Sequence, residues 1–271
     1  MKTRIITAIV ALLIFIPVVI FANTTLFTIS AFEVKIINVA IAVLSLVGTF
    51  EAIKCIGAHK NSNMYFTLGM AFMLPIITST DLFFYTPVFI ALLFILLFAG
   101  VIGNKSITCD KVLLVFALAF YVTASFGSMI VIYNTEKLLF PLIFVGAWVT
   151  DTFAYFSGYF LGKHKLIPSV SPKKTVEGAI GGSLATTITF GVYGWIRIGD
   201  VKLALILAAI GLVTSVVSQF GDLAASLIKR QWGIKDYGNL FPGHGGVLDR
   251  FDSILAVSAF LYIITIFVTF N

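Results

Sequence analysis

The stretch KLALILAAIGLVTSVVSQFGDLAASLIKR, residues 202–230, decides the fold class of this 271-residue chain. No charged side chain interrupts it between Lys202 and Asp222. An α-helix needs roughly 20 apolar residues to cross a bilayer, and this stretch supplies them. A strand of a membrane β-barrel would instead alternate apolar and polar residues. The stretch therefore predicts a membrane-spanning helix.

The rest of the chain has the same character. It is 59% hydrophobic and 11% charged, with a mean hydropathy of +1.07, whereas soluble domains carry about a quarter charged residues. We expect an all-α, polytopic integral membrane protein with about nine spans, the first of which is too long for a signal peptide. The expected spans are 5–22, 36–56, 64–80, 82–102, 111–133, 137–161, 176–198, 202–228 and 248–270.

Basic residues are distributed unevenly between the loops. Of 18 Lys and Arg, 14 fall on the side of the N-terminus and 4 on the other side when nine spans alternate. Because cytoplasmic loops are enriched in Lys and Arg, we expect a cytoplasmic N-terminus and a C-terminus on the far side. Loops 162–175 and 229–250 hold eight of the 14, a concentration that topology alone does not require.

A polar stripe follows one face of the span that contains residues 202–228. Its members recur at steps of three and four, which places them on one side of a helix: Ser215, Ser218, Gln219, Asp222, Ser226 and Lys229. Serines on such a stripe can simply bind neighbouring helices together. Asp222 indicates a functional role, because an acid inside a span is costly unless it faces water, a partner or a metal.

The last span begins with two more acids, Asp249 and Asp252, at helical spacing. They could be partners of the helix dipole, worth under about 1 kcal/mol each. Together with Asp222, however, they offer carboxylates from two adjacent helices, and such an oxygen-rich set suits a hard cation such as Mg²⁺.

A glycine-rich loop, FPGHGGVLD at 241–249, separates these acids along the chain. Its glycines permit sharp turns and close approach to a ligand, and exposed amides without side chains can form an anion-binding nest. His244 remains open between a phosphate donor, a general acid and a structural turn residue. A plain re-entrant turn would also use Pro-Gly, so the glycines alone are weak evidence.

A second polar patch surrounds Asp151 in the sixth span and continues into the lysine-rich loop 162–175. We expect its SPKKT segment, 171–175, to form a constrained turn. The chain contains no Walker motif, so a bound triphosphate would depend on Lys, Arg, backbone amides and metal. Solvated lysines are the alternative interpretation of this loop.

The order of residues from Ser226 to Asp252 resembles the signature of phosphatidate cytidylyltransferases. It reads S-x-I-K-R-x4-K-D-x-G-x2-F-P-x-H-G-G-V-x-D-R-F-D. The upstream block from Asp151 to Gly182, with GKHKL-x-P-x2-SPKKT-x-EG, is similar to a second region of that family. Residues 1–135 resemble the family only in being hydrophobic.

The resemblance implies a nucleotidyltransferase that makes CDP-diacylglycerol and pyrophosphate from CTP and phosphatidic acid in phospholipid biosynthesis. It divides the chain into N-terminal spans, 1–135, and a catalytic region, 136–271. It implies an active site at the cytoplasmic face of the cell (inner) membrane and contact with membrane lipids. Nucleic acid is not an expected partner, and a homodimer stands as an alternative to the monomer.

The resemblance also suggests roles for individual residues. The expected catalytic residues are Asp222, Asp249, Lys229, Arg250 and His244. The expected substrate contacts are Ser171, Lys173, Lys174, Thr175, Ser226, Arg230, Lys235, Gly245 and Gly246. Asp222 and Asp249 are the expected ligands of Mg²⁺, with Asp252 and Asp151 as further candidates and K⁺ as an additional ion.

Two rival functions fit part of the pattern. An ion-coupled secondary transporter would use the membrane acids as a relay, although a dense cationic, glycine-rich loop fits it poorly. A CTP-dependent kinase for a polyprenol or phytol would release CDP rather than pyrophosphate.

Overall fold

The computed structural model describes residues 20–29, 32–59, 63–77 and 108–268, together with 13, 16–18, 87, 90, 91, 93–95, 97 and 98. Most of the expected spans 5–22 and 82–102 therefore lies outside the described residues. The chain divides into two compact units, Met1–Asn134 with Ile234–Arg250, and Thr135–Gly233 with Phe251–Asn271.

Five helices in the described part of the chain are long and apolar enough to cross a membrane. They are α2 (Ile36–Cys55), α5 (Cys109–Thr135), α6 (Phe140–Leu161), α8 (Val201–Gln231) and α9 (Leu248–Phe267). The bounds expected from hydropathy differ from these by three residues or fewer. The prediction of a helical membrane protein is confirmed at this level.

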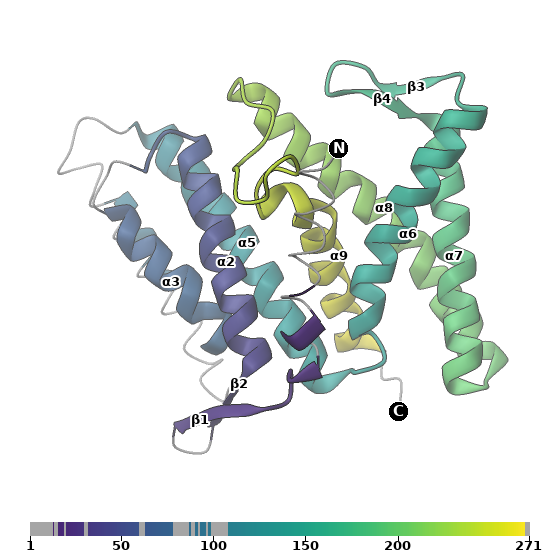
Figure 1. The fold of residues 1–271 in the computed structure, drawn as a ribbon, viewed down its shortest axis with the longest axis horizontal. Coiled ribbons are helices and arrows are strands. Elements are labelled where there is room, and N and C mark those ends of the chain that lie inside the picture. Colours follow the sequence, from purple (N-terminus) through teal and green to yellow (C-terminus); the bar gives the residue numbers. More distant parts are fainter. Residues whose placement is uncertain are drawn as a thin grey trace. The chain divides into compact units, whose positions relative to one another are not determined.

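In the first unit, α2 packs against α3 (Asn63–Ile77), as Figure 1 shows at its purple and blue end. The strands β1 (Thr25–Ile29) and β2 (Phe32–Lys35) form an antiparallel hairpin that leads directly into α2. Gly48 brings α2 close to two neighbours, since a Cβ there would lie 3.2 Å from Leu248 and 3.4 Å from Val122. The core of this unit thus joins α2 and α5 to the first turn of α9.

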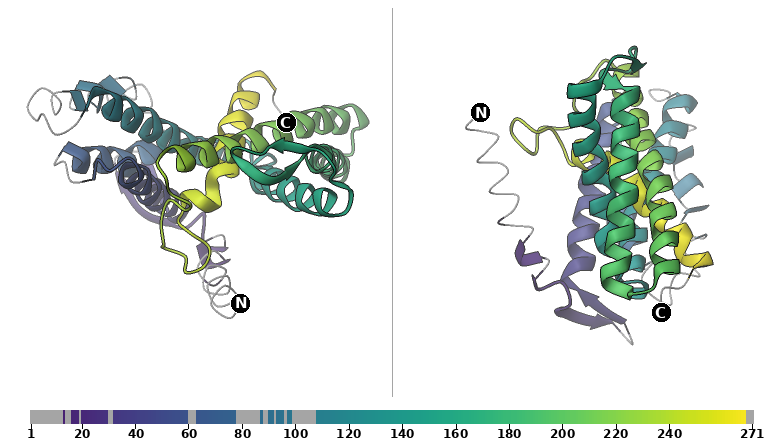
Figure 2. Two further views of the ribbon diagram at one scale, coloured as in Figure 1. Left: turned by 90° about the horizontal axis from the view of Figure 1, so that it is seen from above. Right: turned by 90° about the vertical axis from the view of Figure 1, so that its right-hand side faces the viewer.

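In the second unit, α6, α7 (Val176–Ile198) and α8 lie side by side, with α7 in contact with both neighbours (Figures 1 and 2). Small residues permit this close approach: a Cβ at Gly182 would lie 2.7 Å from the Thr150 carbonyl oxygen. A buried hydrogen bond of 2.7 Å joins Thr150 and Thr186 across the same interface. The remainder of α9 packs on α8 at Gly221.

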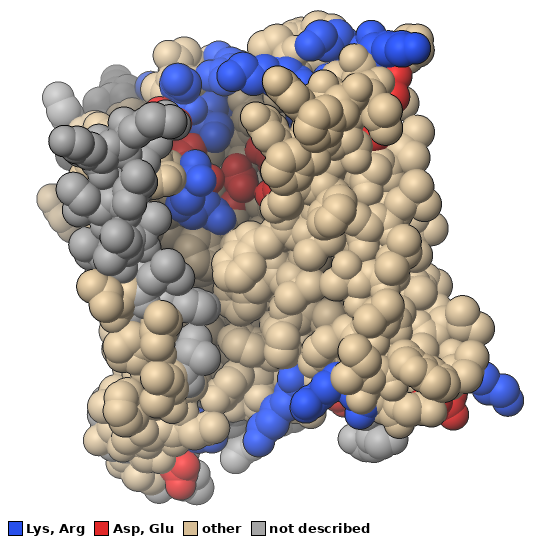
Figure 3. All heavy atoms as spheres, turned by 45° about the vertical axis from the view of Figure 1, so that its right-hand side comes forward, with Lys and Arg blue, Asp and Glu red and all other residues tan. Residues whose placement is uncertain are grey.

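On the face that Figure 3 shows, most charged side chains lie toward the top or the bottom, with a broad uncharged band between them. One end of the second unit carries the α7–α8 connection, where Gly199 has a φ of +76° and Asp200 accepts hydrogen bonds from the amides of Lys202 and Leu203. The other end carries the loop between α6 and α7. This distribution matches the apolar interior and polar surfaces of a bilayer.

The loop between α6 and α7 contains a β-hairpin, so the expectation of a turn at 171–175 is wrong. Strand β3 (Lys165–Ile167) pairs antiparallel with β4 (Ser171–Thr175). The hairpin is closed at its base because the Val176 amide donates to the His164 carbonyl at 2.9 Å. Lysine, serine and proline do not show the β-branched alternation from which strands are predicted.

Candidate functional site

Three carboxylates of the second unit come from three helices. They are Asp151 on α6, Asp222 on α8 and Asp252 on α9. Asp252 interacts electrostatically with both other acids, and the Ser253 hydroxyl donates to Asp151 at 3.5 Å. Like charges so arranged repel one another unless a cation offsets them. The acid cluster therefore requires positive charge nearby.

Two lysines supply positive charge to the acid cluster. Lys174, on β4, places its Nζ 2.5 Å from Asp222 Oδ2, and Lys229 is a buried cation that interacts with Asp252. Ser226 lies one helical turn from Asp222, and its hydroxyl donates to that carboxylate at 3.5 Å. The sequence had suggested all of these residues, and the fold brings them together.

The donor set of the cluster suits a hard divalent cation, because carboxylate oxygens are the ligands that Mg²⁺ prefers. In the described conformation Lys174 is the cation beside Asp222. Among the described residues, no three His, Cys, Asp or Glu side chains converge closely enough to form a ready metal site. Metal binding here would require the carboxylates to converge further and would have to compete with Lys174.

Asp249 belongs to the first unit and is engaged with the backbone there. It is buried, and its Oδ2 accepts hydrogen bonds from the amides of Tyr237 at 2.8 Å and Gly246 at 2.9 Å. These contacts tie the loop that precedes α9 to the first turn of the helix. Asp249 therefore has an organising role in addition to the ligand role expected from the sequence.

The glycine-rich loop is a compact turn. The Phe241 carbonyl accepts hydrogen bonds from the amides of His244 at 2.8 Å and Gly245 at 3.1 Å. Gly245 has a φ of +91°, which side chains other than glycine rarely adopt. The Nδ1 atom of His244 is buried and has no hydrogen-bond partner within the described chain.

The amides expected to form an anion-binding nest already have acceptors within the protein. Asp249 accepts a hydrogen bond from the Gly246 amide, and a second carboxylate accepts from the amides of Val247 and Leu248. The second acceptor is Glu51 on α2, a residue that sequence reasoning missed. An acid within an apolar span was the available signal, and it is the same one that marked Asp222.

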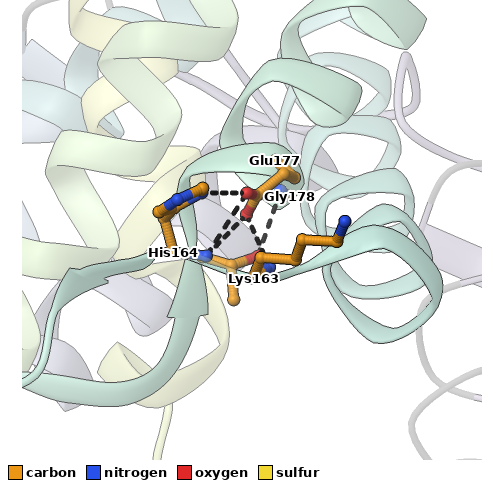
Figure 4. Close-up of polar contacts among 5 residues, drawn as sticks. Lys163, His164, Glu177 and Gly178 are labelled. Atoms are coloured by element: carbon orange, nitrogen blue, oxygen red, sulfur yellow. Dashed lines mark hydrogen bonds and ion pairs between the residues drawn. The ribbon is translucent and has the colours of Figure 1, made fainter.

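The hairpin β3–β4 is fastened to the start of α7 (Figure 4). Glu177 Oε1 lies 2.6 Å from His164 Nδ1, while Oε2 accepts from the amides of Lys163 at 3.1 Å and His164 at 3.2 Å. Glu177 lies in the first turn of α7, beside the hairpin. These contacts hold the end of the hairpin against α7.

The other predicted substrate contacts take different positions. Thr175 is buried and caps α7, since its Oγ1 accepts from the Gly178 amide at 3.1 Å. Ser171 pairs with Ile167 across the hairpin. The remaining basic candidates are exposed: Lys173, Arg230, Lys235 and Arg250.

Comparison with known proteins identifies the family. The model of the cytidylyltransferase family matches residues 2–268. The chain belongs to this family. A phosphatidate cytidylyltransferase of Staphylococcus haemolyticus is 33% identical, over 98% of this chain and 99% of its own length. A phosphatidate cytidylyltransferase of Staphylococcus saprophyticus is 36% identical, also over 98% of this chain and 99% of its own length. That of Bacillus subtilis is 42% identical over 62% of this chain and 63% of its own length.

Proposed function

We infer that this chain is a membrane phosphatidate cytidylyltransferase. A phosphate oxygen of phosphatidic acid attacks the α-phosphorus of CTP, the bond to the bridging oxygen breaks, and pyrophosphate leaves with that bond's electron pair. The products are CDP-diacylglycerol and pyrophosphate. The observation that carries this inference is the acid and lysine cluster of Asp222, Asp252, Lys174 and Lys229, within a chain that matches the family over nearly its whole length.

The side chains of the cluster address the main obstacle to this reaction, which is the repulsion between two polyanions. Lys174 and Lys229 offer cations to the phosphate oxygens, and Arg250 offers a planar guanidinium suited to bidentate contact. Positioning and charge neutralisation supply most of the catalysis in phosphoryl transfer. His244 would donate a hydrogen bond to a phosphate oxygen or a proton to the leaving pyrophosphate.

Metal dependence is part of the proposal. Asp222 and Asp249 would hold Mg²⁺, with Asp252 and Asp151 as further candidate ligands and K⁺ as an additional ion. When bound, the metal would polarise the α-phosphate and stabilise the leaving pyrophosphate. The oxygen donors of the cluster and the closeness of its like charges support this assignment.

The proposal includes a membrane topology. About nine spans would cross the cell (inner) membrane, with the N-terminus and the 162–175 and 229–250 loops in the cytoplasm. CTP would then arrive from the cytosol, and phosphatidic acid would enter from the bilayer. The uneven distribution of Lys and Arg supports this orientation. A homodimer remains an alternative to the monomer.

Labelled CTP tests the function. Purified protein in detergent, incubated with phosphatidic acid and CTP labelled at the α-phosphate, is expected to transfer the label into the lipid fraction and release pyrophosphate. CTP labelled at the γ-phosphate is the control: label in a lipid from this position would indicate a lipid kinase instead. No labelled lipid from either substrate would contradict an enzyme of either kind and favour a transporter.

A further inference from the structure

Glu51 is a buried acid of α2 that lies outside both family-like sequence blocks. Only 5% of its surface is exposed. Its Oε1 accepts a hydrogen bond from the Val247 amide at 3.0 Å, and its Oε2 accepts one from the Leu248 amide at 2.9 Å. Each carboxylate oxygen thus holds one backbone donor, 196 and 197 residues away in the sequence.

These two amides belong to the beginning of α9. The first amides of a helix lack partners within the helix, and the helix dipole makes its N-terminus electropositive. Glu51 satisfies them from a neighbouring helix, as an N-cap residue would from within the chain. Charge-assisted hydrogen bonds of this kind are stronger than neutral ones. The direction in which α9 begins is therefore fixed from α2.

The loop before α9 is shaped around the same carboxylate. A Cβ built at Gly238 or at Gly246 would overlap the carboxylate of Glu51. Both positions lie in the segment that leads to α9, and a side chain at either would require the carboxylate of Glu51 to move. Glu51 therefore contacts the loop at its beginning and at its end.

We propose that Glu51 is a positioning residue for cytidylyl transfer, which holds the 238–248 loop and the first turn of α9 so that His244, Asp249 and Arg250 are correctly placed. The inference rests on the proposed function. Two observations carry it: the paired hydrogen bonds of a buried carboxylate, and the two glycines that make room for it. It follows that, while Glu51 accepts from the Val247 and Leu248 amides, these two amides are not open to a phosphate group.

The substitution Glu51→Gln tests this role. Glutamine has the same shape but only one acceptor oxygen, so its amide group would face a backbone N–H with another donor. A misplacement of about 1 Å near reacting groups can cost about 100-fold in rate. We expect kcat/KM for CTP to fall at least about tenfold, mainly through kcat, at temperatures where the variant remains folded.

A matched control separates positioning from general destabilisation. Ile41→Ala removes a buried side chain of the same helix that lies ten residues from Glu51 and cannot accept a hydrogen bond from the loop amides. It should lower the melting temperature while leaving kcat and KM near wild type. If Glu51→Gln kept wild-type kinetics, or lost only as much as Ile41→Ala at equal stability, the positioning role would be wrong.

Coupling to Arg250 gives a second readout. If Glu51 acts through the first turn of α9, then Arg250→Lys should cost much less in the Glu51→Gln background than in the wild type. Additive losses would contradict the proposal. If Glu51→Gln yields no folded protein, Glu51→Asp replaces it: the carboxylate is kept but withdrawn by one methylene, and wild-type kinetics in that variant would equally contradict the role.

Hydrogen exchange distinguishes a failure of this inference from a failure of the proposed function. In Glu51→Gln, the amides of Val247 and Leu248 should exchange at least about tenfold faster than in the wild type, because their acceptor is weakened. This measurement needs no turnover. An inactive wild type with fast exchange in the variant would overturn the reaction but keep the anchoring. An active wild type with unchanged exchange and unchanged kinetics in the variant would overturn the inference alone.

Discussion

Asp222 and Asp249 are both expected metal ligands, but they differ in what already holds them. Asp249 accepts hydrogen bonds from two backbone amides of the loop that precedes α9, whereas Asp222 forms an ion pair with the side chain of Lys174. Backbone amides are fixed parts of the fold, and a lysine side chain is free to exchange one anion for another. The two acids should therefore respond differently to substitution by asparagine.

Asp249→Asn should lower the melting temperature with and without Mg²⁺. Replacing a charged acceptor of two buried amides by a neutral one costs about 1–3 kcal/mol of the free energy of unfolding. The measurement is thermal unfolding across a Mg²⁺ titration. A variant as stable as the wild type in the absence of metal would show that the two amide contacts contribute little.

Asp222→Asn should leave stability without metal near wild type, because the loss of the ion pair to Lys174 is offset by relief of the repulsion with Asp252. It should abolish both Mg²⁺-dependent stabilisation and most turnover of CTP. Asp252→Asn serves as the comparison from the neighbouring helix. Near-normal turnover of Asp222→Asn at ordinary Mg²⁺ would rule out the ligand role of Asp222.

At this scale the sequence predicted residue types better than contacts. Asp222 stood out because an acid interrupts an apolar helix, and its partner Lys174 was predicted to lie in the same site. Glu51 carries the same signal within α2 but lies outside the two sequence blocks in which the resemblance to the family was seen. The amide contacts of Glu51 and Asp249 depend on the path of a loop, and no periodicity of side chains encodes that path.

Among the elements, α7 is the one whose packing against α6 depends most directly on a glycine. A Cβ at Gly182 would lie 2.7 Å from the carbonyl oxygen of Thr150, which cannot move without bending α6. Gly182→Ala should destabilise the second unit by about 1–3 kcal/mol through overpacking, seen as a lower melting temperature. Gly69→Ala in α3 is the control, since nothing lies within 4 Å of a Cβ there. Equal stability of both variants would contradict the tight packing of α6 on α7.

The β3–β4 hairpin should depend on Glu177 for its attachment to α7. Glu177 Oε2 accepts from the amides of Lys163 and His164, and Oε1 lies 2.6 Å from His164 Nδ1. Protease cleavage at residues 168–170 should therefore be slow in the wild type and faster in Glu177→Gln, because glutamine has only one acceptor oxygen. Cleavage that is unaffected by the substitution would show that other contacts hold the hairpin.

The helices were predictable because apolar runs are long and their ends are marked by charge. The observed bounds of α2 and α9 begin at the expected residues 36 and 248. The β3–β4 hairpin was not predictable, since its order comes from contacts with α7: the Thr175 cap and the Glu177 contacts with His164. The composition of residues 165–175, rich in Lys, Ser and Pro, is typical of a loop, which is what the sequence predicted.

On the scale of the molecule, the two units are not continuous in sequence. The segment 234–250 groups with the N-terminal helices, although residues on both sides of it belong to the second unit. Local patterns describe neighbours along the chain, and such an exchange arises from packing between distant segments. The assignment of catalysis to residues 136–271 stays a prediction, and Glu51 extends the candidate machinery beyond them.

The topology is the prediction that belongs to the whole molecule, and α7 offers the sharpest place to test it. Its 23 residues span about 34 Å at 1.5 Å per residue, which is close to the bilayer core of about 30 Å. Residues 165 and 202 flank opposite ends of this helix.

After replacement of Cys55 and Cys109, single cysteines at 165 and 202 would be treated with an impermeant thiol reagent in sealed, right-side-out vesicles. We expect labelling at 202 without lysis and at 165 only after lysis, because cytoplasmic loops are enriched in Lys and Arg and residue 165 lies in a lysine-rich loop. Labelling of residue 165 in intact vesicles would show that the orientation is opposite to the one proposed, and that cytosolic CTP cannot reach Lys174 and Asp222.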